Sequence, residues 1–370
     1  MLNYWREQKA VLYGVFLIFF CLLLSLAVAK TPPGQMDKGI PGNKDKIVMA
    51  TDAPDYIQIY KPEKGAPPKL YPSDERLNDM KIDKAGERIF VATKEGWLNI
   101  FSPEKWGRGV KRFKLGDVLQ GVAISGDEKY VAVGLGNKDD YNARDVGIYN
   151  IEKIMDGDPY DVPIKSIVHM MGDIQAIFGN PDPANNRGYI ISSQASTITI
   201  FDFASGKQIR TVEVGNSMGF FRCSPDGKKG YGSINAKQSV AIIDLTKNQE
   251  KTIKHIKLPS SPYYLAFNSE GTRLYAGSRD RSEVYVIDTV TDEHIWTYKL
   301  VNPYAHLSLT AELIAVSTNE DYIYMVPQYG IIMIYEITKE DAEDNTSSLH
   351  AVQKRQFVKA PSLMEVIRPD

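Results

Sequence analysis

The stretch FRCSPDGKKGYGSINAKQSVAIIDLTK at residues 221–247 decides the fold. It reads as a short strand, a turn at Pro225-Asp226-Gly227, a second strand at Gly230–Ile234, a polar turn and a third strand at Val240–Asp244. Alternating residues with turn-forming residues between them are typical of antiparallel strands joined in sequence. The stretch therefore predicts an antiparallel meander.

The same arrangement returns 44 residues later without a gap, as LAFNSEGTRLYAGSRDRSEVYVIDTVT at residues 265–291. The positions that correspond are Gly227 with Gly271, Tyr231 with Tyr275, Val240 with Val284, and Asp244 with Asp288. A supersecondary unit that repeats at this period indicates a β-propeller or a related array.

Four further full units lie at residues 78–102, 119–151, 174–203 and 312–337. A seventh unit at residues 48–61 lacks its first strand, whereas Leu363–Arg368 is a strand-like run left over near the other end of the chain. An open ring would leave two unpaired sheet edges, so we expect Leu363–Arg368 to be the inner strand of the unit that begins at Val48. The sequence predicts an all-β fold at residues 47–370, a single seven-bladed β-propeller closed by N- and C-terminal strands.

Residues 1–29 are predicted to lie outside this fold. Arg6 and Lys9 give a basic start, Val11–Ala29 is uncharged, and Ala27-Val28-Ala29 offers small residues at a cleavage site. This pattern favours a cleaved signal peptide over a retained membrane anchor, although the apolar run is also near the length of a membrane span. Residues 30–46 read as a leader rich in Pro, Gly and Lys. We expect an exported protein in a periplasm-like compartment, with membrane attachment only if the first segment is retained.

Composition excludes some classes of function. The formal net charge is −2, whereas a nucleic-acid-binding protein is expected to show a strongly basic face. With 43% hydrophobic residues, the chain can bury a large core. Of the two cysteines, Cys21 lies in the N-terminal apolar run and Cys223 on a predicted inner strand, where we interpret it as a small core residue instead of a nucleophile.

No catalytic motif is visible. The chain has no CxxCH, so it cannot hold a c-type haem by the usual thioether linkage, and no CxxC, HExxH, GxSxG or phosphate-binding loop. The five histidines are scattered without metal-ligand spacing, at His169, His255, His294, His306 and His350. We predict no catalytic, cofactor-binding or metal-binding residue in this chain.

Three other patterns have structural interpretations that we prefer. His169-Met170-Met171 offers soft-metal ligands but reads as an outer strand. Asp139-Asp140 with Asp145 could suggest calcium, but the spacing does not fit an EF-hand and such a loop is usually only solvated. Tyr263-Tyr264 could line the channel or a blade interface, and core packing is the default.

The segment Thr246–Ser261, TKNQEKTIKHIKLPSS, is locally basic in an acidic protein. It is predicted to include the outer strand of its blade, where lysines commonly protect an exposed sheet edge. The alternative is a docking element for an acidic partner subunit. The candidate docking residues are Lys247, Lys251, Lys254, His255 and Lys257.

The run VYVIDTVTDE at residues 284–293, preceded by LYAGS, resembles the repeat of YVTN propellers, which are similar to the heavy subunits of quinoprotein amine dehydrogenases. An exported propeller of this size without a haem motif also resembles the propeller (β) subunits of hydrazine synthases from anammox bacteria. That resemblance covers the whole chain and rests on the general character of the sequence. It implies no catalytic residue here.

The second resemblance implies a cofactor-free subunit of a hetero-oligomer whose partner subunits carry haem c and make hydrazine from nitric oxide and ammonium. It would place the protein in the anammoxosome lumen. One alternative is the heavy subunit of a quinoprotein amine dehydrogenase, whose quinone lies on a smaller partner. A further alternative, a self-contained propeller hydrolase or lactonase, needs polar inner strands, whereas those predicted here are mostly apolar.

Overall fold

A computed structural model describes residues 39–367 of the chain, with gaps at 52–55, 66–67, 74, 107–108, 138–142, 163, 170–172, 193–195, 302–309, 312, 327–330, 338–344 and 357–360. Residues 39–370 form one compact unit. The predicted signal peptide at residues 1–29, Asp139-Asp140, Met170-Met171 and His306 lie outside the described residues.

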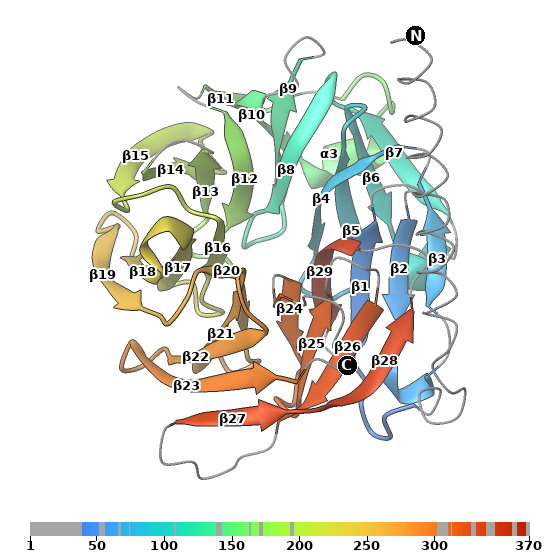
Figure 1. The fold of residues 1–370 in the computed structure, drawn as a ribbon. Helices are drawn as coiled ribbons and strands as arrows, with labels where there is room; N and C mark the ends of the chain where they lie inside the picture. The colour runs from blue at the N-terminus through green and yellow to red at the C-terminus, as the bar shows by residue number, and fades with distance from the viewer. Residues whose placement is uncertain are drawn as a thin grey trace, which may run out of the picture. The chain divides into compact units, whose positions relative to one another are not determined.

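Seven sheets stand around a central channel, as predicted, and the fold is a seven-bladed β-propeller (Figure 1). We number the blades in chain order and give their strands from the channel outward. Blade 1 is β29 (Pro361–Ile367), β1 (Lys46–Thr51), β2 (Tyr56–Tyr60) and β3 (Lys69–Pro72). Blade 2 is β4 (Leu77–Ile82), β5 (Ile89–Thr93), β6 (Trp97–Phe101) and β7 (Val110–Lys114). Blade 3 is β8 (Val118–Ile124), β9 (Tyr130–Gly136), β10 (Ala143–Asn150) and β11 (Ser166–His169).

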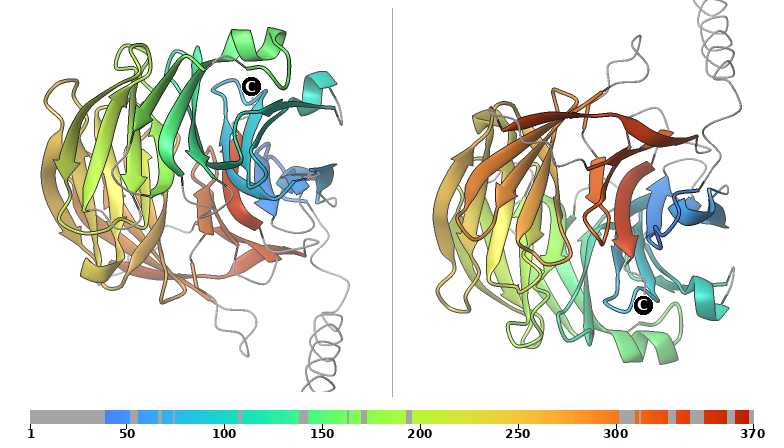
Figure 2. Two further views of the ribbon diagram at one scale, coloured as in Figure 1. Left: turned by 90° about the horizontal axis from the view of Figure 1, so that it is seen from above. Right: turned by 90° about the horizontal axis from the view of Figure 1, so that it is seen from below.

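The remaining blades follow in order around the ring (Figure 2). Blade 4 is β12 (Ile174–Gly179), β13 (Arg187–Ser192), β14 (Thr197–Asp202) and β15 (Lys207–Glu213). Blade 5 is β16 (Phe220–Cys223), β17 (Lys229–Ile234), β18 (Ser239–Asp244) and β19 (Lys251–Lys257). Blade 6 is β20 (Pro262–Phe267), β21 (Arg273–Ser278), β22 (Glu283–Asp288), β23 (Glu293–Leu300) and β27 (Thr346–Leu349). Blade 7 is β24 (Leu313–Val316), β25 (Tyr322–Val326), β26 (Ile331–Glu336) and β28 (Ala351–Gln356).

The ring closes as the sequence predicts. The C-terminal strand β29 pairs antiparallel with β1, in a register that runs from Lys46 opposite Ile367 to Thr51 opposite Pro361. Met364 on β29 is 1% exposed and belongs to a core cluster shared by blades 6, 7 and 1. The surplus strand at one terminus thus supplies the strand missing at the other.

The predicted turn glycines adopt the backbone conformation that the repeat requires. Gly227 and Gly271 have φ of +71° and +73°, in the left-handed region that favours glycine. A Cβ at Gly227 would also lie 2.2 Å from the Asn180 side-chain oxygen of blade 4. These two glycines are therefore fixed both by the turn and by the approach of the neighbouring blade.

The aligned residues Tyr231 and Tyr275 join neighbouring blades. Tyr231 on β17 is fully buried and its hydroxyl donates to Asp292 of blade 6 at 3.0 Å. Lys229, two residues earlier, pairs with the same carboxylate at 2.7 Å. The repeat therefore preserves a contact between blades as well as a turn.

Blade 6 repeats this contact toward blade 7. The Tyr275 hydroxyl donates to Glu320 at 2.5 Å, and Arg273 pairs with Glu320 at 3.0 Å. Burial alone would raise the pKa of Glu320, but hydrogen bonds from Tyr275, Asn268 and Arg273 lower it below its ordinary value. Glu320 is thus held as a carboxylate by its neighbours.

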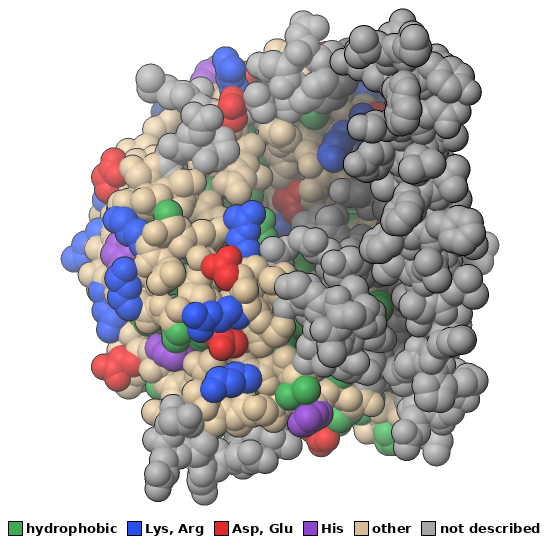
Figure 3. Space-filling model, in the orientation of Figure 1, with side chains coloured by type: hydrophobic (Ala, Val, Ile, Leu, Met, Phe, Trp, Pro, Cys, Tyr) green, Lys and Arg blue, Asp and Glu red, His purple; other side chains and the backbone are tan. Residues whose placement is uncertain are grey.

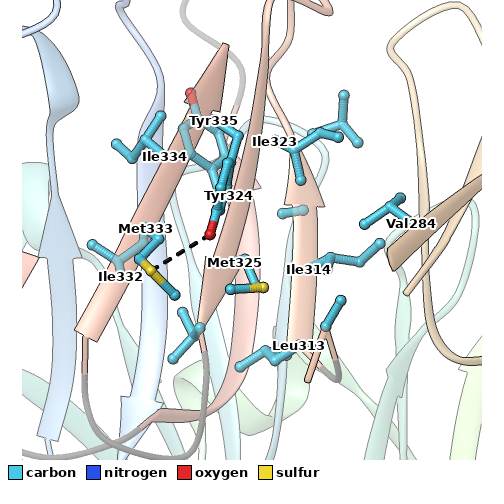
Figure 4. Close-up of a cluster of buried hydrophobic side chains, with 14 of the residues drawn as sticks. Val284, Leu313, Ile314, Ile323, Tyr324, Met325, Ile332, Met333, Ile334 and Tyr335 are labelled. Atoms are coloured by element: carbon cyan, nitrogen blue, oxygen red, sulfur yellow. Dashed lines mark hydrogen bonds between the residues drawn. The ribbon is translucent and has the colours of Figure 1, made fainter. Parts of the chain in front are cut away.

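Blade 7 shows how the apolar residues fill the blades. Its strands β25 and β26 are rich in Ile, Tyr and Met, and these side chains belong to one core cluster with Ile314 of β24 and Val284 of blade 6 (Figure 4). The Tyr335 hydroxyl donates to the Met333 sulfur at 3.5 Å within this cluster. Burial of such side chains supplies the main driving force for folding.

Two features of the connections differ from the sequence expectation. Ile151, assigned to the third strand of its unit, instead begins the short helix α3 (Ile151–Asp156), because the Asn150 side chain caps it by accepting from the Lys153 amide. After β26, the chain adds β27 in parallel to β23 of the preceding blade before returning as β28. Parallel pairing between distant segments leaves no local turn signal in the sequence.

The other short helices among the described residues are α2 (Pro103–Trp106), η1 (Pro62–Lys64) and η2 (Asn235–Lys237). Within the described part of the chain, no helix is long and apolar enough to cross a membrane.

Candidate functional site

An ion pair spans the central channel. Arg222 on β16 of blade 5 donates to Glu365 on β29 of blade 1 at 2.6 Å, and both side chains are mostly buried. Arg222 also donates to the Leu265 carbonyl of blade 6 at 3.3 Å. The pair therefore links the closing strand to blades on the other side of the ring.

Aromatic rings hold the arginine in place. Phe220 and Tyr264 are stacked with their ring centroids 4.0 Å apart, and the Arg222 guanidinium lies 5.2 Å from the first centroid and 5.7 Å from the second. The Tyr264 hydroxyl donates to the Met364 carbonyl at 3.3 Å. Burial alone would lower the pKa of Arg222, but Glu365 and Tyr264 raise it above its ordinary value, so the guanidinium stays charged. Of the tyrosine pair predicted from sequence, Tyr264 is buried and Tyr263 half-buried.

Two cavities of about 250 and 200 Å³ lie in the channel on either side of Arg222 and Cys223. Cys223 is on the inner strand, as expected, but it lines both cavities and only partly packs against the core of blades 4 and 5. Burial raises the pKa of its thiol well above the ordinary value, and the smaller effect of Arg222 does not offset this. The thiol is therefore protonated at neutral pH and a poor nucleophile.

A second pair in the channel has a local role. Asp79 on β4 accepts from the Val122 amide of blade 3 at 2.9 Å, beside the bulge of β8, and pairs with Lys81 at 3.1 Å. Arg222 and Lys81 are thus each paired with a carboxylate that already serves the fold. Among the residues that the structure describes, no group of three or more His, Cys, Asp and Glu is placed to hold a metal ion.

The predicted docking segment lies on the outside of blade 5. Its outer strand β19 spans Lys251–Lys257, and Lys247 precedes it in the turn after β18. All five candidate docking residues, Lys247, Lys251, Lys254, His255 and Lys257, are exposed. Figure 3 shows lysine and arginine side chains gathered over the outer strands on this side of the ring.

A buried ionic cluster anchors this segment. Glu250 has a fully buried carboxylate 3.8 Å from Arg187 and 3.4 Å from Arg210, both on blade 4. Asn248 accepts from the same two arginines, through its side chain at 3.1 Å and its carbonyl at 3.2 Å. The basic segment is therefore a fixed surface, which reduces the entropy lost when a partner binds.

The described histidines remain dispersed. Burial, with smaller effects from Lys237 and Lys257, lowers the pKa of His255, so its ring is neutral at pH 7. His294 on β23 contacts the Trp296 carbonyl at 2.9 Å, and burial lowers its pKa. His169 lies on the outer strand β11, as expected, and contacts Asp145 at 2.7 Å. His350 is exposed between β27 and β28.

No known protein family and no curated protein matches this chain.

The fold itself is widely shared. A functionally unknown protein from Desulfotomaculum acetoxidans DSM 771 has a similar crystal structure, with a TM-score of 0.70 at 14% identity over 88% of this chain and 100% of the other. The dihydro-haem d1 dehydrogenase NirN, solved in complex with DHE, is similar with a TM-score of 0.57 at 13% identity over 91% of this chain and 78% of the other. At such identities these likenesses show the fold alone.

Sequence reasoning missed Arg222, Glu365 and Glu250. Arg222 interrupts the apolar inner strand GFFRC, and a lone charge in such a strand needs a partner. That signal pointed to a buried pair, but the partner lies 143 residues away on the closing strand. Glu250 carried a similar signal as the one acid among four lysines of the basic segment.

Proposed function

We propose that this propeller is a cofactor-free subunit that scaffolds a multihaem c-type oxidoreductase complex, similar to hydrazine synthase. In this proposal the chain is exported to a periplasm-like compartment, the anammoxosome lumen in anammox bacteria, and haem c is held by its partner subunits. The observation that carries the proposal is the fixed surface of blade 5 that is made basic by Lys247, Lys251, Lys254 and Lys257, with His255 among them.

The channel is compatible with a scaffolding role. Arg222 and Glu365 occupy its middle and are committed to each other and to the closing strand. A catalytic site needs a nucleophile or base within reach of a reacting atom, and the protonated Cys223 thiol does not supply one. A propeller of similar architecture occurs in a haem d1 dehydrogenase, which is consistent with a place in haem enzymology.

The test is assembly with haem-bearing partners from the native source. Changing Lys247, Lys251, Lys254 and Lys257 together to Glu replaces attraction by repulsion for an acidic partner. One exposed charge pair contributes only about 0.2–1 kcal/mol, so a single Lys→Ala change should have little effect. The fourfold variant should lose co-purification, most strongly at low ionic strength, where charges are least screened.

A matched control carries the same charge change elsewhere. Lys64, Lys69, Lys105 and Lys129 are also exposed, on blades 1 to 3, and their fourfold change to Glu should leave assembly intact. Equal co-purification of the two variants would rule out the blade 5 surface as the docking element. The purified chain alone should show no haem absorbance, whereas a quinone chromophore in the native complex would favour the amine dehydrogenase alternative.

A further inference from the structure

The outer strand of blade 6 carries an added strand that the outer strand of blade 5 lacks. On blade 6, β27 pairs in parallel with β23, from Thr297 opposite Thr346 to Leu300 opposite Leu349, and Figure 1 shows it lying along β23. Among the residues that the structure describes, no strand lies beyond β19 in the sheet of blade 5. Because the two blades are copies of one repeat, β27 indicates what the edge of β19 can receive.

The backbones of β19 and β23 match each other. Each strand has a bulge whose extra residue is an isoleucine, Ile253 in β19 and Ile295 in β23. After the bulge, the amides of Leu258 and Leu300 each donate at 2.8 Å to a carbonyl just before the third strand of their blade. The bulge therefore precedes the residues that β27 pairs with and does not hinder the addition of a strand.

The outward amides of β19 are those of His255 and Lys257, because successive amides of a strand point in opposite directions. On blade 6 the corresponding Thr297 amide donates to the Asn345 carbonyl at 3.0 Å, where β27 begins. Pro259 has no N–H to donate, so pairing along β19 ends at the residue before it.

The edge of β19 leaves apolar surface in water. Ile253 is 48% exposed, whereas Ile295 is half-buried and packs against the core cluster that contains Leu349 of β27. An added segment on β19 would cover the equivalent surface, and burial of apolar surface favours binding.

The lysines of β19 are not neutralised within the described part of the chain. No acidic side chain there pairs with Lys254 or Lys257, and Lys257 donates only to a backbone carbonyl, at 2.9 Å. Glu250 is committed to the arginines of blade 4. The exposed acids on the neighbouring outer strands are Glu213 and Glu293, and neither forms an ion pair with β19. An added segment can therefore supply the missing negative charge.

The position of β27 fixes where such a charge would lie. On blade 6 the Trp296 indole nitrogen donates to the Ser347 hydroxyl at 3.1 Å. Lys254 occupies the place of Trp296 after the bulge. An acidic residue at the place of Ser347 would thus face the Lys254 ammonium.

The next two places follow from the same register. The residue at the place of Ser348 would lie beside Lys257, where a second acid is favoured. The residue at the place of Leu349 would lie beside Leu258, which is buried in the core between blades 5 and 6. The edge therefore suits two consecutive acids followed by a large apolar residue.

The outer strand of blade 4 does not offer the same match. On β15 the place of Lys254 is taken by Arg210, which already pairs with Glu250 at 3.4 Å. The place of Lys257 is taken by Glu213, which would repel an acid. Lysines on a sheet edge also discourage pairing with segments that lack acids, so the β19 lysines select their occupant.

We propose that β19 binds an extended acidic segment of a partner protein as a fifth strand, parallel to His255–Leu258. This inference rests on the proposed function and deepens it by giving the form of the partner's contact. Main-chain hydrogen bonds supply affinity in such an arrangement, and the side chains supply specificity.

The test uses the purified chain and a fluorescein-labelled ten-residue peptide with Thr-Glu-Glu-Leu at its centre, read by fluorescence anisotropy. The peptide should bind saturably, and more weakly as salt is added. Lys254→Glu should weaken binding about fivefold, because it replaces attraction by repulsion. The matched control is Lys207→Glu, at an exposed lysine of β15, and it should bind like the unchanged chain. Both lysines are exposed, so both variants should fold.

A modified peptide tests strand addition itself. Methyl groups on the alternate backbone nitrogens that face β19 should weaken binding about tenfold or more, because they remove main-chain hydrogen bonds. Equal binding of the methylated and unmodified peptides would overturn the proposal. So would the absence of saturable binding, or equal binding of a peptide with Lys in place of Glu.

These outcomes are separate from the assembly test of the proposed function. Assembly that depends on the lysines, together with peptide binding that methylation leaves unchanged, would refute strand addition and leave the proposed function standing. Peptide binding that depends on Lys254 and on the peptide backbone, together with intact assembly of the fourfold lysine variant, would support strand addition and refute the proposed function.

Discussion

Removing the closing strand should unfold the whole propeller. The change is a deletion of residues 363–370, which takes away most of β29 and leaves β1 as an open sheet edge. Deletion also removes the buried Met364 side chain and Glu365, the partner of Arg222 across the channel. The effect can be estimated from single substitutions at these two positions.

Met364→Ala creates a cavity at a residue that is 1% exposed and should cost about 2–5 kcal/mol. Glu365→Ala leaves Arg222 without its carboxylate, and breaking a buried pair in this way costs about 3–5 kcal/mol. Because Arg222 and Glu365 keep 20% and 24% exposure, the lower figure applies. Together the two changes approach about 5–8 kcal/mol, which is comparable to the total stability of a typical folded domain.

The assay is urea unfolding followed by far-UV circular dichroism, with light scattering to detect aggregation. The two single variants should unfold cooperatively at lower urea concentration, and the deletion variant should have no cooperative transition. Ile253→Ala, at a residue that is 48% exposed on β19, is the control and should change stability by less than about 0.5 kcal/mol. A deletion variant that melts like the full-length chain would refute closure by β29.

Two further predictions concern acidic residues that join blades. Glu320→Gln should lower the melting temperature at pH 7, and the difference from the unchanged protein should shrink as the pH falls below about 4.5. The reason is that a depressed folded-state pKa gives stability above the unfolded-state pKa, and this stability is lost when the carboxylate is protonated. A difference that stays constant down to pH 3 would contradict this. Glu250→Gln should cost about 3 kcal/mol in urea unfolding, because it leaves two arginines of blade 4 short of a buried partner, whereas Glu213→Gln on exposed β15 should be nearly neutral. Equal midpoints for these two variants would show that the cluster does not anchor the segment.

The fold could be predicted from the sequence because the strand-and-turn pattern of each blade is local and is repeated along the chain. Gly227 and Gly271 mark the same turn, and the period of 44 residues between them gave the blade count. Closure followed from the count alone, because the blade that begins at Val48 lacked a strand. Counting the strands in each repeat unit thus predicted the pairing of the two ends of the chain, which no local pattern could indicate.

Contacts between blades were harder to predict. The sequence aligned Tyr231 with Tyr275, but their partners, Asp292 and Glu320, come from different turns of the next blade and therefore do not align with each other. A cavity of about 500 Å³ beside Tyr160 was missed for a related reason. It forms between the end of α3 on blade 3 and β7 on blade 2, and neither segment alone has a binding pattern.

Closure by β29 also sets the order of events during synthesis. Lys46 lies opposite Ile367, so β1 cannot pair until residues more than 300 positions further along the chain have been made. Contacts between residues so distant in sequence form slowly, because the chain between them loses conformational entropy before the paired strands can stabilise the closed loop. Until then β1 presents an unpaired edge, and the chain is open to strand exchange with its neighbours.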